Sequence, residues 1–233
     1  MKKILVPTDF SDFAINACKL AADIARKTDA EVYFLHVVSI PSYESGILPF
    51  QNQQDMAEGL FILKKVKEHF SNLFKQDFLK GVKCVEAVSF DGVYESITEQ
   101  AKKNGIDLIV MGTHGTSGFV SDYFIGSNTD KVVRQSEVPV IAIKSEIKNP
   151  KFGHVLFAGD FSEKIDKSFG PIKDFAKIFN SKIELLHVVT KGEFFYTGPL
   201  TKRMSEFAEK QGLTNFECHV FNAESVQTGI NEF

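Results

Sequence analysis

The sequence lacks the features that mark several protein classes. Its three cysteines, Cys18, Cys84 and Cys218, are scattered and odd in number, and no Cys-x-x-Cys pair is present. This pattern favours reduced thiols in a cytoplasmic protein over a disulfide framework or a zinc site. The net charge of −3 argues against a general nucleic-acid-binding protein, which is usually basic. We therefore expect a cytoplasmic protein with no nucleic-acid partner.

Long hydrophobic runs are missing as well. The apolar run at the start of the chain, residues 4–6, is stopped by Pro7. It is too short for a signal peptide or a membrane span. The run predicts a first β-strand, and we expect no membrane partner.

The sequence also contains no familiar catalytic motif. It has no Gly-x-Ser-x-Gly elbow, no Walker loop ending in Gly-Lys-Ser/Thr and no Gly-x-Gly-x-x-Gly fingerprint. No pair of a nucleophile and a base stands out. We therefore assign no catalytic residue and no metal-ligating residue, and we expect at most slow hydrolysis of a bound nucleotide.

Strand and helix patterns alternate along the chain. Apolar strands are expected at residues 4–6, 31–38, 82–90, 106–111 and 138–143, and helices at residues 12–27, 53–74, 93–104 and 127–135. Such alternation predicts βαβ units and a parallel sheet, so the fold class is α/β.

An internal repeat divides the chain. Residues 154–162 echo residues 3–11, and residues 186–189 echo residues 35–38, both at an offset of 151 residues. We predict a complete domain at residues 1–145, a linker at residues 146–151 and an incomplete second copy at residues 152–233. The second copy has no counterpart of residues 106–143, and therefore no second glycine loop.

A glycine loop organises the first copy. The apolar strand that ends at Met111 breaks at Gly112, a segment rich in Gly, Ser and Thr follows, and Gly126-Ser127 opens a helix. Glycine lets a phosphate approach the backbone N–H groups, and a helix N-terminus adds unpaired donors and a positive dipole end. The structural alternative is a tight turn, with residues 127–130 forming a capping box that needs no ligand.

Four motifs together resemble the universal stress protein family. They are residues 3–11 (KILVPTDFS), residues 35–38 (LHVV), residues 111–115 (MGTHG) followed by Gly126-Ser127, and residues 138–140 (VPV). The resemblance covers residues 1–145 well, and residues 152–233 as the first part of a second copy. It implies a Rossmann-like, doubly wound, five-stranded parallel sheet of the adenine nucleotide alpha hydrolase-like kind, with helices on both faces. In family members that bind ATP, the nucleotide lies at the carboxyl ends of the strands.

The resemblance also implies the site residues and the ligand. Asp9 and Val37 would contact adenine or ribose. The phosphates would be held by Gly112, Gly115, Gly126 and Ser127, with Pro7, Thr8, Met111, His114 and Asn128 as further candidates. The expected cofactor is ATP, with Mg²⁺ beside the triphosphate, and AMP and ADP are alternatives.

Two departures from the family pattern bear on this expectation. The loop has ten residues between Gly115 and Gly126, one more than the family spacing, and residues 112–130 contain no Lys or Arg. A triphosphate would then depend on backbone N–H groups, the helix end and a metal ion. A helix end contributes roughly 0.3–2 kcal/mol per charge, so we expect modest affinity.

Structural interpretations compete at three further residues. Asp9 could simply order the turn after the first strand, and its counterpart Asp160 in a copy without a phosphate site favours that interpretation. His36 and His187 lie inside apolar strands, which favours a core or strand-end histidine over a catalytic one.

A non-enzymatic function is the main expectation. The resemblance implies a stress-response or regulatory protein in which nucleotide binding shifts a conformation or an assembly. The alternative is an interaction module of the same fold without a nucleotide. In either case we expect a homodimer through the edge strand at residues 138–143, because an uncovered apolar edge favours pairing. A weaker third possibility is an adenine-nucleotide hydrolase.

Overall fold

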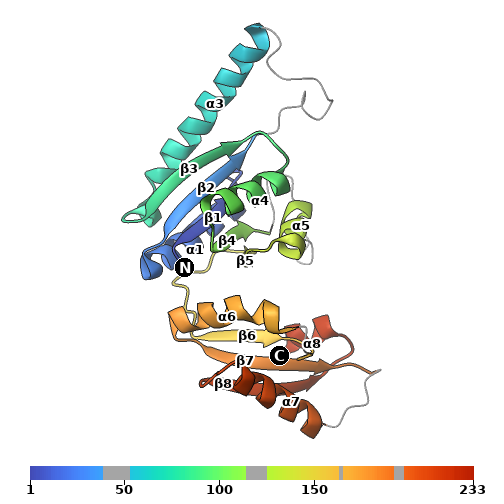
Figure 1. The fold of residues 1–233 in the computed structure, drawn as a ribbon. Helices are drawn as coiled ribbons and strands as arrows, with labels where there is room; N and C mark the ends of the chain where they lie inside the picture. The colour runs from blue at the N-terminus through green and yellow to red at the C-terminus, as the bar shows by residue number, and fades with distance from the viewer. Residues whose placement is uncertain (39–52, 114–124, 163–164, 192–196) are drawn as a thin grey trace. The chain divides into compact units, whose positions relative to one another are not determined.

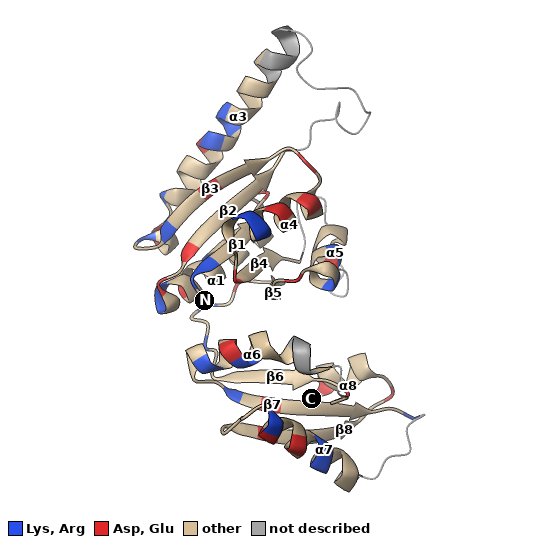
Figure 2. Ribbon diagram, in the orientation of Figure 1, with Lys and Arg blue, Asp and Glu red and all other residues tan. Residues whose placement is uncertain are grey.

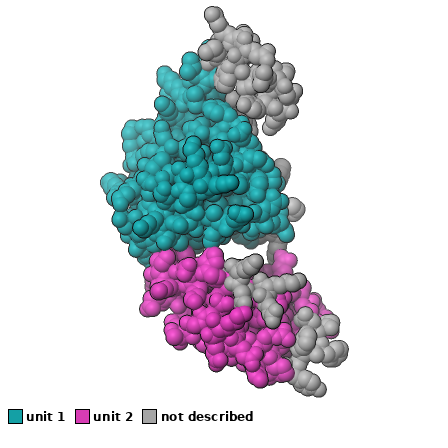
Figure 3. Space-filling model, viewed as in Figure 1, with its two compact units in different colours: residues 1–150 teal, residues 151–233 magenta. Residues whose placement is uncertain are grey.

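The computed structural model describes residues 1–38, 53–113, 125–162, 165–191 and 197–233 (Figure 1). Two compact units make up the chain, Met1–Pro150 (unit 1) and Lys151–Phe233 (unit 2), which Figure 3 shows in separate colours.

Unit 1 alternates strands and helices around one sheet. Its five strands are all parallel and lie in the order β3-β2-β1-β4-β5, as the α/β expectation requires. The elements are β1 (Lys3–Pro7), α1 (Asp12–Thr28), β2 (Glu31–Val37), α3 (Gln53–Phe74), the 3-10 helix η1 (Asp77–Leu79), β3 (Lys83–Ser89), α4 (Val93–Asn104), β4 (Leu108–Gly112), α5 (Ser127–Gln135) and β5 (Val140–Ile143). The predicted five-stranded, Rossmann-like sheet is confirmed.

Helices cover both faces of this sheet (Figure 1). Adjacent residues of a strand point to opposite faces, and the neighbours Phe34 and Leu35 of β2 show the division. The Phe34 ring packs against Phe74 of α3 at 5.6 Å, on the face that α1 also covers. Leu35 belongs to a buried cluster with Ile97 of α4 and Val132 of α5. One face of the sheet is therefore covered by α1 and α3, and the other by α4 and α5.

The predicted starts of two strands are corrected by two residues. β4 begins at Leu108 instead of residue 106, and β5 begins at Val140 instead of residue 138. The N–H of Ile106 donates to the carbonyl of Ala101, so Ile106 still closes the end of α4. Pro139 has no N–H to give to a ladder, although its carbonyl accepts from Ile109 at 2.9 Å.

Unit 2 contains a smaller parallel sheet in the order β6-β7-β8. Its elements are β6 (His154–Ala158), α6 (Asp166–Phe179), β7 (Lys182–Val189), α7 (Thr197–Lys210), β8 (Phe216–Asn222) and α8 (Val226–Glu232). Aromatic rings fill the core between α6, α7 and the sheet, with ring centroids 4.8 Å apart for Phe157 and Phe169 and 5.0 Å apart for Phe169 and Phe207.

None of the helices in the described part of the chain combines the length and the apolar character needed to cross a bilayer.

Candidate functional site

The carboxyl ends of β1, β2 and β4 meet at one edge of the unit 1 sheet. β1 is hydrogen-bonded to β2 on one side and to β4 on the other. The strand order therefore changes direction at β1, which creates the kind of switch point where α/β sheets bind ligands. The sequence-predicted residues Thr8, Asp9, Val37 and Gly112 all lie at the ends of these strands.

Two backbone hydrogen bonds hold the base of the glycine loop. The N–H of Thr113 donates to the carbonyl of Ile143 at 3.0 Å, and the N–H of Gly126 donates to the carbonyl of Thr113 at 2.7 Å. The second bond places the first turn of α5 directly at the carboxyl end of β4. The predicted residues His114 and Gly115 lie outside the described residues.

The N-terminus of α5 has no side-chain cap. Gly126 is the N-cap residue, with φ −56° and ψ 145°, and Ser127 is the first helical residue. The predicted capping box at residues 127–130 is therefore wrong, because it requires the Ser127 hydroxyl at the N-cap position. Ser127 and Asn128 are exposed. The first N–H groups of a helix have no intrahelical acceptor, so the end of α5 can donate to an anion.

Gly112 has a packing role that its sequence context did not reveal. A Cβ atom at this position would lie 2.8 Å from the carbonyl oxygen of Phe13 and 2.9 Å from its carbonyl carbon. The glycine therefore lets the first turn of α1 lie directly against the end of β4. Its carbonyl accepts from the Thr129 hydroxyl at 2.9 Å, which ties β4 to α5. Phe13 is far earlier in the chain, and no sequence signal pairs it with Gly112.

The turn after β1 is organised by its own side chains. Thr8 is buried, its N–H donates to the carbonyl of Leu35 at 2.8 Å, and its Oγ1 accepts from the N–H of Phe10 at 3.0 Å. Asp9 Oδ1 accepts from the N–H of Ser11 at 3.0 Å. Phe10 has a φ of 63°, in the left-handed region. Thr8 and one carboxylate oxygen of Asp9 thus hold the backbone in this strained turn.

Unit 2 repeats the same turn. Asp160 Oδ1 accepts from the N–H of Ser162 at 2.9 Å, which lowers the pKa of Asp160, and Phe161 has a φ of 52°. This recurrence favours the structural interpretation of the aspartate.

Each turn is also held by a histidine of the next strand. His36 Nδ1 lies 2.8 Å from the carbonyl oxygen of Thr8, and His187 Nδ1 lies 3.1 Å from that of Gly159. The two histidines are strand-end residues that fix the turn, as expected.

Apolar residues lie beside the turn that follows β1. Met111 is 5% exposed and belongs to the cluster under α4 and α5, and the half-buried Val37 packs against this cluster. Pro7 is half-buried at the end of β1, opposite Leu35. The structure therefore brings Pro7, Val37 and Met111 to the same edge, with the side chains of Val37 and Met111 directed to the α4 side of the sheet.

Lys131 of α5, the first basic residue after the glycine loop, is already paired. It directly follows residues 112–130, which contain no Lys or Arg. Its Nζ lies 3.0 Å from Glu95 Oε1 and 4.5 Å from the centre of the Tyr94 ring. This hydrogen bond lowers the pKa of Glu95. Figure 2 shows that α4 carries residues of both charge signs. Within the part of the chain that the structure describes, no group of three or more His, Cys, Asp or Glu residues could hold a metal ion.

Sequence comparison identifies the family. A family model described as the universal stress protein family matches residues 1–144. The chain belongs to this family. It is similar to the universal stress protein MJ0531 of Methanocaldococcus jannaschii, at 35% identity over 156 residues that span 63% of this chain and 84% of that protein. The universal stress protein YxiE of Bacillus subtilis is 30% identical over 153 residues, which span 61% of this chain and 98% of YxiE.

Solved structures of universal stress proteins share the fold. The structure of MJ0577, a universal stress protein of Methanocaldococcus jannaschii, covers 63% of this chain and 98% of its own, with a TM-score of 0.53 and 28% identity. A universal stress protein of Archaeoglobus fulgidus covers 98% of this chain and 80% of its own, with a TM-score of 0.63 and 20% identity, which is a likeness of fold alone. Membership of the family supports a role in the stress response.

Proposed function

We propose that unit 1 binds an adenine nucleotide and acts in the stress response through binding rather than turnover. The hydrogen bond from the Gly126 N–H to the Thr113 carbonyl (2.7 Å) is the observation on which the proposal depends. It places an uncapped helix N-terminus at the switch point of the sheet, where a phosphate can accept from the backbone N–H groups.

The nucleotide would bridge two parts of the edge. Its phosphates would lie at the N-terminus of α5, within reach of Ser127 and Asn128, and its adenosine part would lie toward Asp9 and Val37. The helix end contributes roughly 0.3–2 kcal/mol per charge. Because Lys131 is paired with Glu95, ATP would need Mg²⁺ to balance its negative charge. AMP and ADP carry less negative charge and would need less positive charge at the site.

Binding at this place would link separate elements of unit 1. β1 and β4 are adjacent strands, and α5 follows β4 in the chain. A ligand that contacts all three stabilises the folded unit by about 2.7 kcal/mol at 100 times its dissociation constant. Such a ligand shifts a conformational equilibrium without any bond being broken.

The sharpest test is a Ser127→Asp variant studied by calorimetric titration with ATP, ADP and AMP, with and without Mg²⁺. Aspartate in the first turn of α5 complements the helix dipole, so the melting temperature of the free protein should stay equal or rise. The same carboxylate repels a phosphate, so nucleotide affinity should fall about 10-fold. An unchanged or higher melting temperature together with a lower nucleotide affinity would show that the site is lost while the fold is kept.

The matched control is Gln227→Asp, which adds the same charge to the first turn of α8 in unit 2. It should leave nucleotide affinity unchanged. Equal affinity in Ser127→Asp and the native chain would place the phosphates elsewhere. If millimolar nucleotide gives no heat and no thermal stabilisation of the native chain, the nucleotide proposal is wrong. The alternative function, an interaction module of the same fold, would then be favoured.

A homodimer through β5 is the second proposal. β5 ends the strand order of the sheet, Ala142 is exposed, and Val140 and Ile141 are only half-buried. An edge strand of this kind favours pairing with a second copy. Light scattering after size exclusion should give the mass of a dimer, and Ala142→Lys should shift it toward the monomer. A native chain that stays monomeric at high concentration would contradict this.

A further inference from the structure

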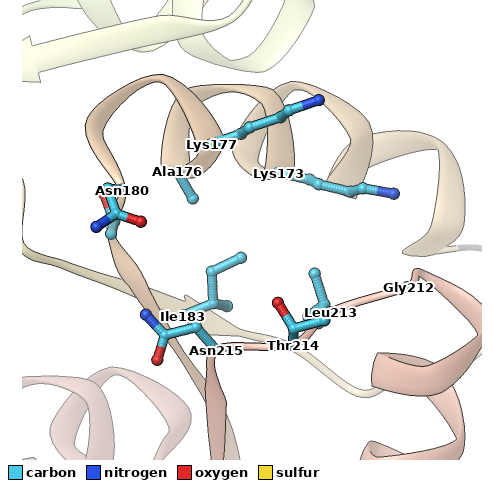
Figure 4. A pocket seen from close by; sticks show the side chains of 10 residues that line it. Lys173, Ala176, Lys177, Asn180, Ile183, Gly212, Leu213, Thr214 and Asn215 are labelled. Carbon is cyan, nitrogen blue, oxygen red and sulfur yellow. The ribbon is translucent and has the colours of Figure 1, made fainter.

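A hollow in unit 2 lies between the end of α6, the start of β7 and the connection from α7 to β8. Its volume is about 350 Å³. Figure 4 shows α6 on one side and the connecting segment on the other, with the Ile183 and Leu213 side chains between them. Its lining includes Lys173, Ala176, Lys177, Ile183, Leu213 and Thr214.

The hollow has an apolar floor and a basic rim. Ala176 is 3% exposed and Ile183 is 4% exposed, and Leu213 packs partly buried against the same core. Lys177 and Thr214 are exposed. Two of the lining residues are lysines, and none is acidic. The surface therefore suits an apolar group that lies beside a negative charge.

The same place in unit 1 is filled by the chain itself. α1 and α6 correspond at the repeat offset, and both end at a left-handed residue with φ 52°, Asp29 and Asn180. In unit 1, the 3-10 helix η1 packs against α1. Its Leu79 is only 4% exposed, and the guanidinium of Arg26, the counterpart of Lys177, donates to the carbonyl of Phe78.

Unit 2 has a shorter connection at this point. In unit 1 residues 75–82 join α3 to β3 and contain η1, whereas in unit 2 residues 211–215 join α7 to β8 and contain no 3-10 helix. The short connection approaches α6 through a hydrogen bond from Lys173 Nζ to the carbonyl of Gln211 at 2.5 Å. The hollow thus corresponds to the space that η1 fills in unit 1.

We propose that this hollow is a docking site for a short segment of a partner protein, which presents a leucine-sized apolar side chain beside a carboxylate. The apolar side chain lies on Ala176, Ile183 and Leu213, and the carboxylate lies near Lys177. The segment Asp77-Phe78-Leu79 occupies the corresponding place in unit 1, where Leu79 is buried and the exposed Asp77 carboxylate pairs with Lys80 of its own segment. The apolar group of the proposed partner therefore follows the example of Leu79, and its carboxylate is inferred from the basic rim. A volume of 350 Å³ is at the small end of ligand sites, so the interaction has one anchor and is weak.

The probe is a capped synthetic peptide of residues 74–82 with Lys75→Gln and Lys80→Gln, which leaves Asp77 as its one charged side chain. It is titrated into the full chain, and methyl NMR signals of Ile183 and Leu213 report binding. We expect saturable shifts at both methyl groups in the submillimolar to millimolar range. A peptide that also has Leu79→Asp should bind at least about 10-fold more weakly, because each buried methylene group contributes roughly a 4-fold gain in affinity.

Two protein variants locate the interaction. Lys177→Glu reverses the charge at the rim and should weaken binding about 5-fold, since an exposed pair contributes up to about a 5-fold gain in affinity. Thr214→Trp places a large side chain over the hollow and should abolish the shifts. Arg203→Glu makes the same charge change at an exposed position of α7 outside the hollow and should bind as the native chain does.

Several outcomes would overturn the proposal. They are no shift at Ile183 and Leu213 at millimolar peptide, equal affinity for the Leu79→Asp peptide, or unchanged binding by Thr214→Trp. Shifts confined to methyl groups of unit 1 would show that the peptide competes with η1 instead. Because the titration contains no nucleotide and the variants lie in unit 2, failure here leaves the nucleotide proposal untouched.

Discussion

The two units begin in the same way and then differ. Both contain a strand, a turn with an aspartate, a helix that ends in a left-handed residue, and a second strand with a histidine that holds the turn. Unit 1 continues through β4, α5 and β5, and the strands β4 and β5 complete its sheet. The described part of unit 2 after β8 contains α8 alone.

Comparing the two units distinguishes residues that shape the turn after the first strand from residues that could bind a ligand. Asp9 and His36 have equivalents in unit 2 that make the same hydrogen bonds, so their positions are explained by the turn. Gly112, Gly126 and Ser127 belong to the part of the fold that is present only in unit 1 among the described residues. The nucleotide proposal therefore depends mainly on these residues.

The described residues of unit 2 contain no counterpart of β4, and this changes the environment of its first strand. In β1, the side chains of Ile4, Leu5 and Val6 are 0% exposed, because β2 and β4 flank the strand and helices cover both faces. In β6, which lies at the end of its sheet, Leu156, the counterpart of Leu5, is 41% exposed. A smaller sheet with an exposed apolar edge buries less surface per residue.

The largest expected contrast between the units is in thiol reactivity. Cys18 of α1 is 0% exposed, and burial raises its pKa to about 12, whereas Cys218 of β8 is only half-buried, and burial raises its pKa as well. At pH 8, iodoacetamide should modify Cys218 at least about 100-fold faster than Cys18, because the thiolate is the reactive form. Peptide mass spectrometry after timed quenching measures both rates.

The same shift predicts a pH dependence of stability. Above about pH 8.5 an unfolded thiol loses its proton, but native Cys18 keeps it up to about pH 12. The free energy of unfolding of unit 1 should therefore be intact below pH 8.5 and fall by up to about 1.4 kcal/mol per pH unit above it. Cys18→Ala should remove most of this slope, and the rest comes from groups such as Cys84, whose pKa burial also raises. Equal labelling of Cys18 and Cys218 in the folded chain would contradict both statements.

The second contrast concerns two glycines. Gly112→Ala in unit 1 should lower the free energy of unfolding by about 1–3 kcal/mol, because the new Cβ lies 2.8 Å from the Phe13 carbonyl oxygen. Gly153→Ala, just before β6, is the matched control, since nothing lies within 4 Å of its Cβ. Urea unfolding followed by circular dichroism compares them. Equal midpoints would show that α1 does not require a glycine at position 112.

The smallest contrast concerns the two histidines. His36→Leu removes the hydrogen bond to the Thr8 carbonyl and should cost about 1–2 kcal/mol. His187→Leu removes the equivalent bond, but it also removes a buried Nε2 atom that has no hydrogen-bond partner among the described residues, so its cost should stay below about 1 kcal/mol. Urea unfolding again gives both values. A larger loss for His187→Leu would show that Nε2 is satisfied in solution.

Much of the fold could be predicted from the sequence because its signals are local. The bounds of α3, α4 and α5 agree with the predicted ones, since apolar periodicity and breakers define them. The error at α5 concerned the cap: Ser127 fits a capping box by composition, but the helix begins at Ser127 itself. A cap depends on one backbone dihedral angle, which a residue pattern does not determine.

The sequence by itself determined the alternation of strands and helices, the internal repeat and the family, because these follow from periodicity and from motifs. Only the tertiary structure showed why residue 112 is a glycine and where the end of α5 lies. It also showed that a hollow in unit 2 corresponds to η1 of unit 1. Each of these depends on backbone segments far apart in the chain that come within a few ångströms of each other, and no local pattern records such an approach.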